Sequence, residues 1–221
     1  MRTIRALTIA AAVVAALPML ATAQGGRQFK DSWFWGVRAG GLTLADSGSN
    51  YVVAPAVGID WMVTRKHGGV YLAASQSFFD QHSFMLRDPV TIDSGFRAIR
   101  LKNMRRFDAA LLGFPGDQIN VHPYVGIGFS VEQIASAVAE GPFSNVDQFN
   151  YAALVIQDEK VSITPVFMGG VQWRLKPISV FAQLTAAASQ RSFIAYNGKP
   201  WNVGLDLGVR YNTGTAISRD P

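Results

Sequence analysis

The chain has 221 residues, 20 Lys and Arg against 15 Asp and Glu, and no cysteine. This length suits one domain. The lack of cysteine excludes disulfide bonds and a lipid-anchored cysteine. The mild positive charge is spread too evenly along the chain to argue for nucleic acid as a partner.

The first residues have the pattern of a secretion signal. Two arginines, an uncharged apolar stretch and a small-x-small cleavage site follow one another: Arg2, Arg5, Leu7 to Leu17 and Ala21-Thr22-Ala23. We predict that residues 1–23 are a cleaved signal peptide and that the mature chain begins near Gln24. The alternative, a membrane-spanning helix, is disfavoured because the stretch is short and Pro18 interrupts it.

Eight later stretches alternate apolar and polar residues, and this period of two is typical of β-strands. They cover 33–42, 52–64, 69–79, a part of 96–114, 123–131, 161–175, a stretch from about 179, and 201–211. Many run ten residues or more, which suits a tilted strand that crosses a bilayer. The third stretch does not show which face is apolar. The fourth is unusually basic, so we expect a bulge or an early start there.

The links between these stretches alternate in length. Tight links follow residues 64 and 175, whereas longer ones occupy 43–50, 80–95, 132–160 and 188–200. Short turns at one end and long loops at the other are typical of outer-membrane barrels. We therefore predict an all-β fold, an eight-stranded antiparallel transmembrane up-and-down β-barrel over residues 24–211. Residues 212–221 would form a short polar periplasmic tail.

The longest link, 132–160, is apolar for an exposed segment. We expect it to extend its two neighbouring strands above the membrane, with one helical turn within Ile134 to Ala139. Folding over the barrel mouth and contact with a partner remain alternatives.

Near the strand ends, large aromatic residues occupy the alternate positions that we expect to face outward from the barrel. We expect a girdle at the periplasmic interface and one residue at the opposite interface. The periplasmic set is Trp33, Trp35, Trp61, Trp173 and Tyr211, and the opposite residue is Trp201.

Three segments resemble small bacterial outer-membrane β-barrel proteins of the OmpA and OmpX type. They are Trp33-Phe-Trp-Gly-Val-Arg-Ala-Gly-Gly41, Pro123-Tyr-Val-Gly-Ile-Gly128 and the closing strand. In the closing strand the match to the signal read by the barrel-assembly machinery rests on Asn202, Gly204, Leu207 and Val209. In many family members this signal ends the chain on an aromatic residue, whereas here ten residues follow Tyr211.

The resemblance implies a place in the outer membrane, with lipid and lipopolysaccharide around the barrel and contact with the assembly machinery during insertion. It identifies no extracellular loop partner. The implied role is structural or surface-interactive in the cell envelope. A soluble periplasmic lipocalin-like barrel, with the apolar faces turned inward, is the alternative architecture.

Charged residues occupy the alternate strand positions that we expect to face the lumen: Arg38, Asp60, Arg100, Arg106, Asp108, Arg174, Asp206 and Arg210. An eight-stranded barrel is barely wider inside than its side chains. We therefore expect opposite charges to pair across the lumen and plug it. The alternative is a narrow channel for ions or small apolar solutes, lined by the same groups.

A second alternative is a lipid A-modifying acyl enzyme that uses His82 and Ser83 near Asp80 and Asp88. Adjacent residues of a strand point to opposite faces, so this pair is poorly placed for base and nucleophile. His67 and His122 fall in tight turns.

We accordingly predict no catalytic residue, no cofactor and no metal. Gly126-x-Gly128 lies inside a strand with no helix after it, so it is no phosphate cradle. Asp46 to Asn50 is expected to be a solvated turn rather than a calcium site.

Overall fold

The computed structural model describes residues 29–45, 51–85, 97–116, 120–143, 145–189, 193–196 and 200–216. Eight strands follow in chain order: β1 (Ser32–Ala45), β2 (Tyr51–Thr64), β3 (Gly68–Met85), β4 (Arg97–Gly113), β5 (Val121–Gly141), β6 (Val161–Arg174), β7 (Ile178–Ala188) and β8 (Trp201–Thr215). The predicted signal peptide, the turn Asp46 to Asn50, Asp88 and the end of the tail lie outside the described residues.

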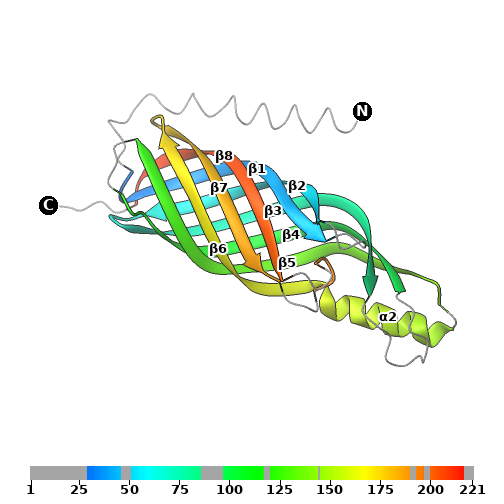
Figure 1. Ribbon diagram of the computed structural model, residues 1–221. Coiled ribbons are helices and arrows are strands. Elements are labelled where there is room, and N and C mark those ends of the chain that lie inside the picture. Colours follow the sequence, from blue (N-terminus) through cyan, green and yellow to red (C-terminus); the bar gives the residue numbers. More distant parts are fainter. Residues whose placement is uncertain are drawn as a thin grey trace, which may run out of the picture.

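Each strand pairs antiparallel with its neighbours in sequence, and β1 pairs with β8 to close the barrel (Figure 1). This confirms the predicted eight-stranded up-and-down barrel. Closure leaves no unpaired edge around the ring, which is the condition for placing strands in lipid. The turns at 65–67 and 175–177 lie at the end of the barrel where β1 begins and β8 ends, opposite the long connections.

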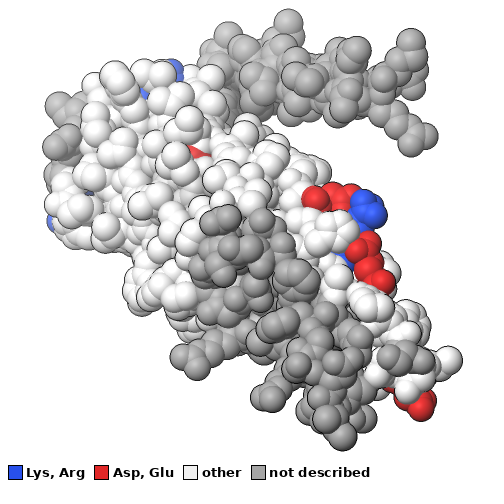
Figure 2. Space-filling model, turned by 45° about the vertical axis from the view of Figure 1, so that its right-hand side comes forward, with Lys and Arg blue, Asp and Glu red and all other residues white. Residues whose placement is uncertain are grey.

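The barrel wall is apolar outside and polar inside. Large apolar side chains such as Leu111, Val125 and Phe129 are 61–65% exposed, while Arg38, Asp60 and Arg210 are buried. The wall seen in Figure 2 is almost free of charged side chains, which gather toward its ends. This arrangement is the reverse of a soluble barrel and indicates that lipid surrounds the wall. In the ranges given above, no helix is long and apolar enough to cross a bilayer.

Three strands continue past the closed ring. The β2–β3 ladder ends at the pair Ala56–Ser77, and the β5–β6 ladder ends at Gln133–Val161. Beyond these pairs β3, β4 and β5 run on as a three-stranded sheet (Figure 1). We call this extension the outer platform: β3 from Phe78, β4 up to Asn103, β5 from Ile134, and the helix α2 (Val146–Glu159).

A bulge at the base of the outer platform reverses the facing of β4. Ser77 pairs with Met104 and Asp80 with Lys102, so two residues of β3 lie opposite Asn103. Asn103 has a φ of 54°, in the left-handed region that asparagine tolerates, and its side-chain oxygen accepts the Phe79 N–H at 3.3 Å. The bulge expected in this basic strand is therefore present.

The prediction for the long link was right about the extension of β5, and wrong about β6, which begins only at Val161, and about the helical turn. Ile134 to Ala139 belongs to β5, which runs on to Gly141. The helix lies later, in α2, where the Asn145 side chain caps the Gln148 N–H at 2.9 Å. Gln148, Ala152 and Ile156, spaced by four residues, form its buried face.

Candidate functional site

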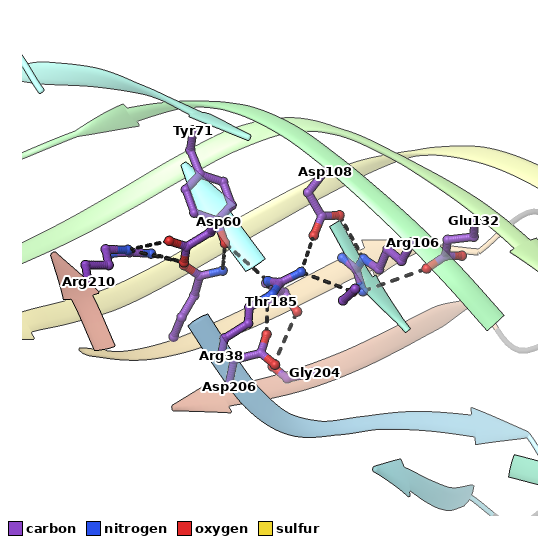
Figure 3. A network of polar contacts seen from close by, with 12 residues as sticks. Arg38, Asp60, Tyr71, Arg106, Asp108, Glu132, Thr185, Gly204, Asp206 and Arg210 are labelled. Atoms are coloured by element: carbon purple, nitrogen blue, oxygen red, sulfur yellow. Dashed lines mark hydrogen bonds and ion pairs between the residues drawn. The ribbon is translucent and has the colours of Figure 1, made fainter. Parts of the chain in front are cut away.

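Arg38 binds two carboxylates in the middle of the lumen. It comes from β1 and donates hydrogen bonds to Asp108 of β4 and Asp206 of β8, each at 3.2 Å. The side chains of Arg38 and Asp108 are at most 2% exposed. Figure 3 shows Arg38 between the two carboxylates, so one guanidinium connects strands on different sides of the lumen.

From Asp108 the ion pairs continue toward the outer platform. Arg106 donates to Asp108 at 2.8 Å and lies 3.7 Å from Glu132 of β5 (Figure 3). Tyr196, in the β7–β8 connection, donates its hydroxyl hydrogen to the same Glu132 carboxylate at 2.9 Å. The chain of contacts thus reaches the segment that closes the outer mouth.

Toward the end of the barrel that carries the tight turns, Arg210 pairs with Asp60. Its guanidinium donates to both carboxylate oxygens at 3.0–3.2 Å and to Gln172 at 2.8 Å. Both partners of this ion pair have side chains with no exposed surface. The Arg210 guanidinium also lies 3.8 Å from the centroid of the Phe181 ring, in cation–π contact.

Tyr71 joins these groups into one lumen network, which comprises Arg38, Asp60, Tyr71, Arg106, Asp108, Glu132, Gln172, Gln183, Asp206 and Arg210. The Tyr71 hydroxyl accepts from Arg38 at 3.2 Å and from Gln183 at 3.3 Å. Its ring lies 5.5 Å from the Arg210 guanidinium. Six of the eight charged residues expected in the lumen are thereby brought together.

Arg100 and Arg174 lie outside the lumen network. The Asn103 bulge turns Arg100 to the exterior of the outer platform, where its side chain is 41% exposed and pairs with Asp80 at 2.7 Å. Counting in twos along β4 from Arg106 predicted that the Arg100 side chain faces the lumen. The count fails because the bulge at Asn103 interrupts the alternation of inward and outward side chains. Arg174 is the last residue of β6, two residues beyond Gln172, the residue that contacts Arg210.

Apolar side chains gather at both ends of the lumen network. At the outer end, Phe193 to Tyr196 are buried against Leu42, Leu44, Ile99, Leu101 and Met104. At the other end, Phe29 stacks on His122 with ring centroids 3.7 Å apart and meets Phe114 edge-on. A cavity beside Arg38, Arg106 and Asp206 holds only about 10 Å³, the space of about one water molecule.

The predicted interface aromatics lie on the outer wall. Trp35 pairs with Trp61 on one side and Tyr211 on the other, which makes a row across β2, β1 and β8. Trp33 packs edge-on against Trp61 at 5.4 Å. Trp173 lies near the end of β6 and is 55% exposed, and Trp201 begins β8 at the opposite end of the barrel.

The four residues that resemble an assembly signal divide between the two faces of β8. Asn202 is buried and Gly204 faces the interior, beside Thr185. Leu207 and Val209 are exposed on the outer wall. The structure gives their positions, and their role in assembly stays a prediction.

Charged side chains cluster on the outer platform. Asp80 accepts from Arg100 and lies 3.1 Å from Lys102, while Glu140 lies 2.8 Å from His82 Nδ1 and 3.9 Å from Arg100. Hydrogen bonding from Arg100 lowers the pKa of the Asp80 carboxyl from 3.8 to about 2. The pair therefore stabilises the platform above pH 3.8 and loses this contribution as the pH falls through about 2.

We expect the Asp80 carboxyl to titrate near pH 2 when followed by NMR, and its midpoint to move toward 3.8 in an Arg100→Met variant. The removed guanidinium is the largest cause of the shift, and Lys102 retains a smaller part. Arg105→Met, on the same strand, is the matched control. An unchanged Asp80 midpoint in Arg100→Met would show that this ion pair does not form in solution.

His82 and Ser83 do not form a base–nucleophile pair. His82 is exposed and contacts Glu140, whereas Ser83 is buried and donates its hydroxyl hydrogen to the Ile194 carbonyl oxygen at 3.4 Å. The strand separates them, as expected for adjacent residues. Within the described ranges, no three His, Cys, Asp or Glu side chains gather in a way that could hold a metal ion.

Comparisons with known proteins find likeness in structure alone. No family model matches the chain, and no curated protein matches it in sequence. The crystal structure of Neisserial surface protein A (NspA) is 14% identical, with a TM-score of 0.51 over 81% of this chain and 96% of that one.

Two further solved structures are similar at lower scores. Ail, the attachment invasion locus protein of Yersinia pestis, is 11% identical, with a TM-score of 0.48 over 83% of this chain and 99% of that one. The outer membrane protease OmpT from Escherichia coli is 10% identical, with a TM-score of 0.42 over 86% of this chain and all of that one. The likeness to NspA supports the fold: this chain has the architecture of a small outer-membrane barrel.

Proposed function

We propose that this chain is an outer-membrane barrel whose lumen is closed and whose outer platform contacts other molecules at the cell surface. The observation that carries this proposal is the filled lumen. The lumen network spans the middle of the barrel, apolar clusters lie at both ends, and a cavity between them, beside Arg38, holds only about 10 Å³. A wall that encloses no passage is suited to anchoring what projects above it.

Three features support the outer membrane as the location. The sequence begins with the pattern of a secretion signal, the exterior wall is apolar, and the long connections lie at the end opposite the start of β1 and the end of β8. In this setting lipid and lipopolysaccharide surround the wall, and the exposed aromatics lie at the two interfaces. The closing strand would engage the barrel-assembly machinery during insertion.

The lumen proposal predicts no ion conduction. We expect the mature protein, refolded and inserted into planar bilayers, to give no conductance steps above the lipid baseline in potassium chloride. An open porin measured in the same bilayers provides the positive control. Regular steps from a preparation that is pure and fully heat-modifiable on a denaturing gel would overturn the closed lumen and favour the channel alternative.

A further inference from the structure

One edge of β5 is left open by the end of β6. The β5–β6 ladder stops at Gln133–Val161, and the last backbone bond on this side runs from the Ile134 N–H to the Lys160 carbonyl oxygen at 2.9 Å. On its other side β5 stays paired with β4 as far as Gly141. Among the described strands, none pairs with β5 along this edge from Ile134 onward, a length of roughly 20 Å at 3.4 Å per residue.

The open edge presents backbone groups at alternate residues. After Ile134 the inward alternation of β5 shifts by one residue: Ala135 and Ser136 are both exposed, and Ala137 and Ala139 pack against the same interior cluster as Ile134. Residues whose side chains share a face direct their N–H and C=O groups to the same side of a strand. Because the Ile134 N–H points away from β4, the backbone groups of Ala137 and Ala139 also point to the open edge. An unpaired strand edge of this kind is a template for another chain.

The helix α2 turns the open edge into a groove. A hollow of about 390 Å³ lies between the two elements, within the range of ~300–1,000 Å³ typical of binding sites. The β5 wall carries the small side chains Ala135, Ser136 and Ala137, which let another backbone approach. The helix wall is formed by Ala153, Ile156 and Gln157, with Lys160 at the base.

The existing ladder fixes the direction of an added strand. A segment that continues the line of β6 runs antiparallel to β5, from Gly141 down toward Gln133. Its C-terminal end then meets Lys160, and β6 already occupies the next position. The incoming segment must therefore end there or turn away. Lys160 is the one charged residue in the groove lining, and its ammonium complements a terminal carboxylate.

We propose that this groove binds the extended C-terminal segment of a partner polypeptide, which adds to β5 as an antiparallel strand with its carboxylate at Lys160. Main-chain hydrogen bonds to Ala137 and Ala139 supply the affinity, as in other cases of strand addition. The inference rests on the proposed surface-interaction role and names the class of partner.

The test uses a library of short linear peptides with free C-termini, screened against the refolded full barrel in detergent. The best binder is then measured by fluorescence anisotropy. Ala137→Pro removes one open-edge N–H without removing a bond to β4, so its affinity should fall about five- to tenfold. Ala137→Ser keeps the N–H and nearly the same side-chain size, so it is the matched control, with affinity near the parent value.

Two further arms examine the orientation. Amidation of the peptide C-terminus and Lys160→Met should each weaken binding, and in combination they should weaken it little further, because they remove the same contact. Ala139→Pro repeats the backbone test if Ala137→Pro fails to fold. The proposal is overturned if no peptide binds, if the proline variants bind like the parent, or if amidation has no effect.

The same variants separate this proposal from the closed lumen. Ala137 lies on the outer platform and Lys160 directly follows its helix, so both lie outside the lumen network. Each folded variant should therefore remain heat-modifiable and without conductance. Loss of peptide binding with a silent bilayer record supports the groove, whereas conduction by the parent protein would refute the closed lumen and leave the peptide result unaffected.

Discussion

Replacing Arg210 by methionine is expected to lower the free energy of unfolding by about 3–5 kcal/mol. The Asp60 carboxylate is fully buried and receives three hydrogen-bond contacts from this guanidinium. Without Arg210 it remains charged and uncompensated, or takes up a proton at a cost, and Gln172 also loses its donor. Urea unfolding in lipid vesicles, followed by tryptophan fluorescence, measures the change.

The double variant Asp60→Leu with Arg210→Met separates ion-pair loss from loss of packing. Two apolar side chains of similar volume leave no buried charge, so most of the lost stability should return. Arg105→Met changes an exposed arginine on the wall and should alter stability by less than about 0.5 kcal/mol. If Arg210→Met matched Arg105→Met, the pair with Asp60 would not be a structural part of the lumen.

Alternation in the sequence was sufficient to predict the barrel, because the outer and inner faces of every strand meet different media. It placed Arg38, Asp108 and Arg210 inside the lumen correctly, since the strand segments around them keep a regular period of two. It failed for Arg100 because the period is interrupted at Asn103. A basic strand suggested a bulge, but its position depends on a backbone angle that only the folded sheet reveals.

The outer half of the network was harder to predict. Glu132 was assigned to a loop, although Ser130, Glu132 and Ile134 continue the inward alternation of β5 and could have shown that the strand runs on. Tyr196 carries no such signal. It reaches Glu132 from a connection between two strands, and this contact over 64 residues of sequence depends on how the connection folds into the barrel mouth.

The outer platform is a consequence of strand length. Within the ring, every strand contributes a buried side chain to the lumen network. Past the ring, β3 is no longer paired with β2, and β5 is no longer paired with β6. The three-stranded sheet there must therefore be covered or remain open. The interior face is covered by α2 and the segment Phe193 to Tyr196, while the edge of β5 borders the groove. A closed wall and an exposed edge thus arise from one sheet.

Gly40→Val is expected to prevent closure between the first and last strands. Gly40 pairs with Asp206 on β8, and a Cβ atom there would collide with the Leu205 carbonyl oxygen and lie 2.6 Å from the Asp206 carboxylate. Backbone cannot yield as a side chain can, and the displaced carboxylate would also leave Arg38. We expect a loss of more than about 3 kcal/mol, seen as loss of the fast-migrating unboiled band on a denaturing gel.

Ala39→Val places the same β-branched side chain at the neighbouring residue, which is exposed on the outer wall. There the two methyl groups meet lipid rather than β8, so the unboiled band should persist. Equal loss of the band in both variants would mean that β-branched bulk anywhere in β1 impairs folding. Retention of the band in Gly40→Val would mean that β1 and β8 approach less closely than their register requires. A difference between the variants would locate the sensitivity at the seam, where barrel closure and the lumen network depend on the same glycine.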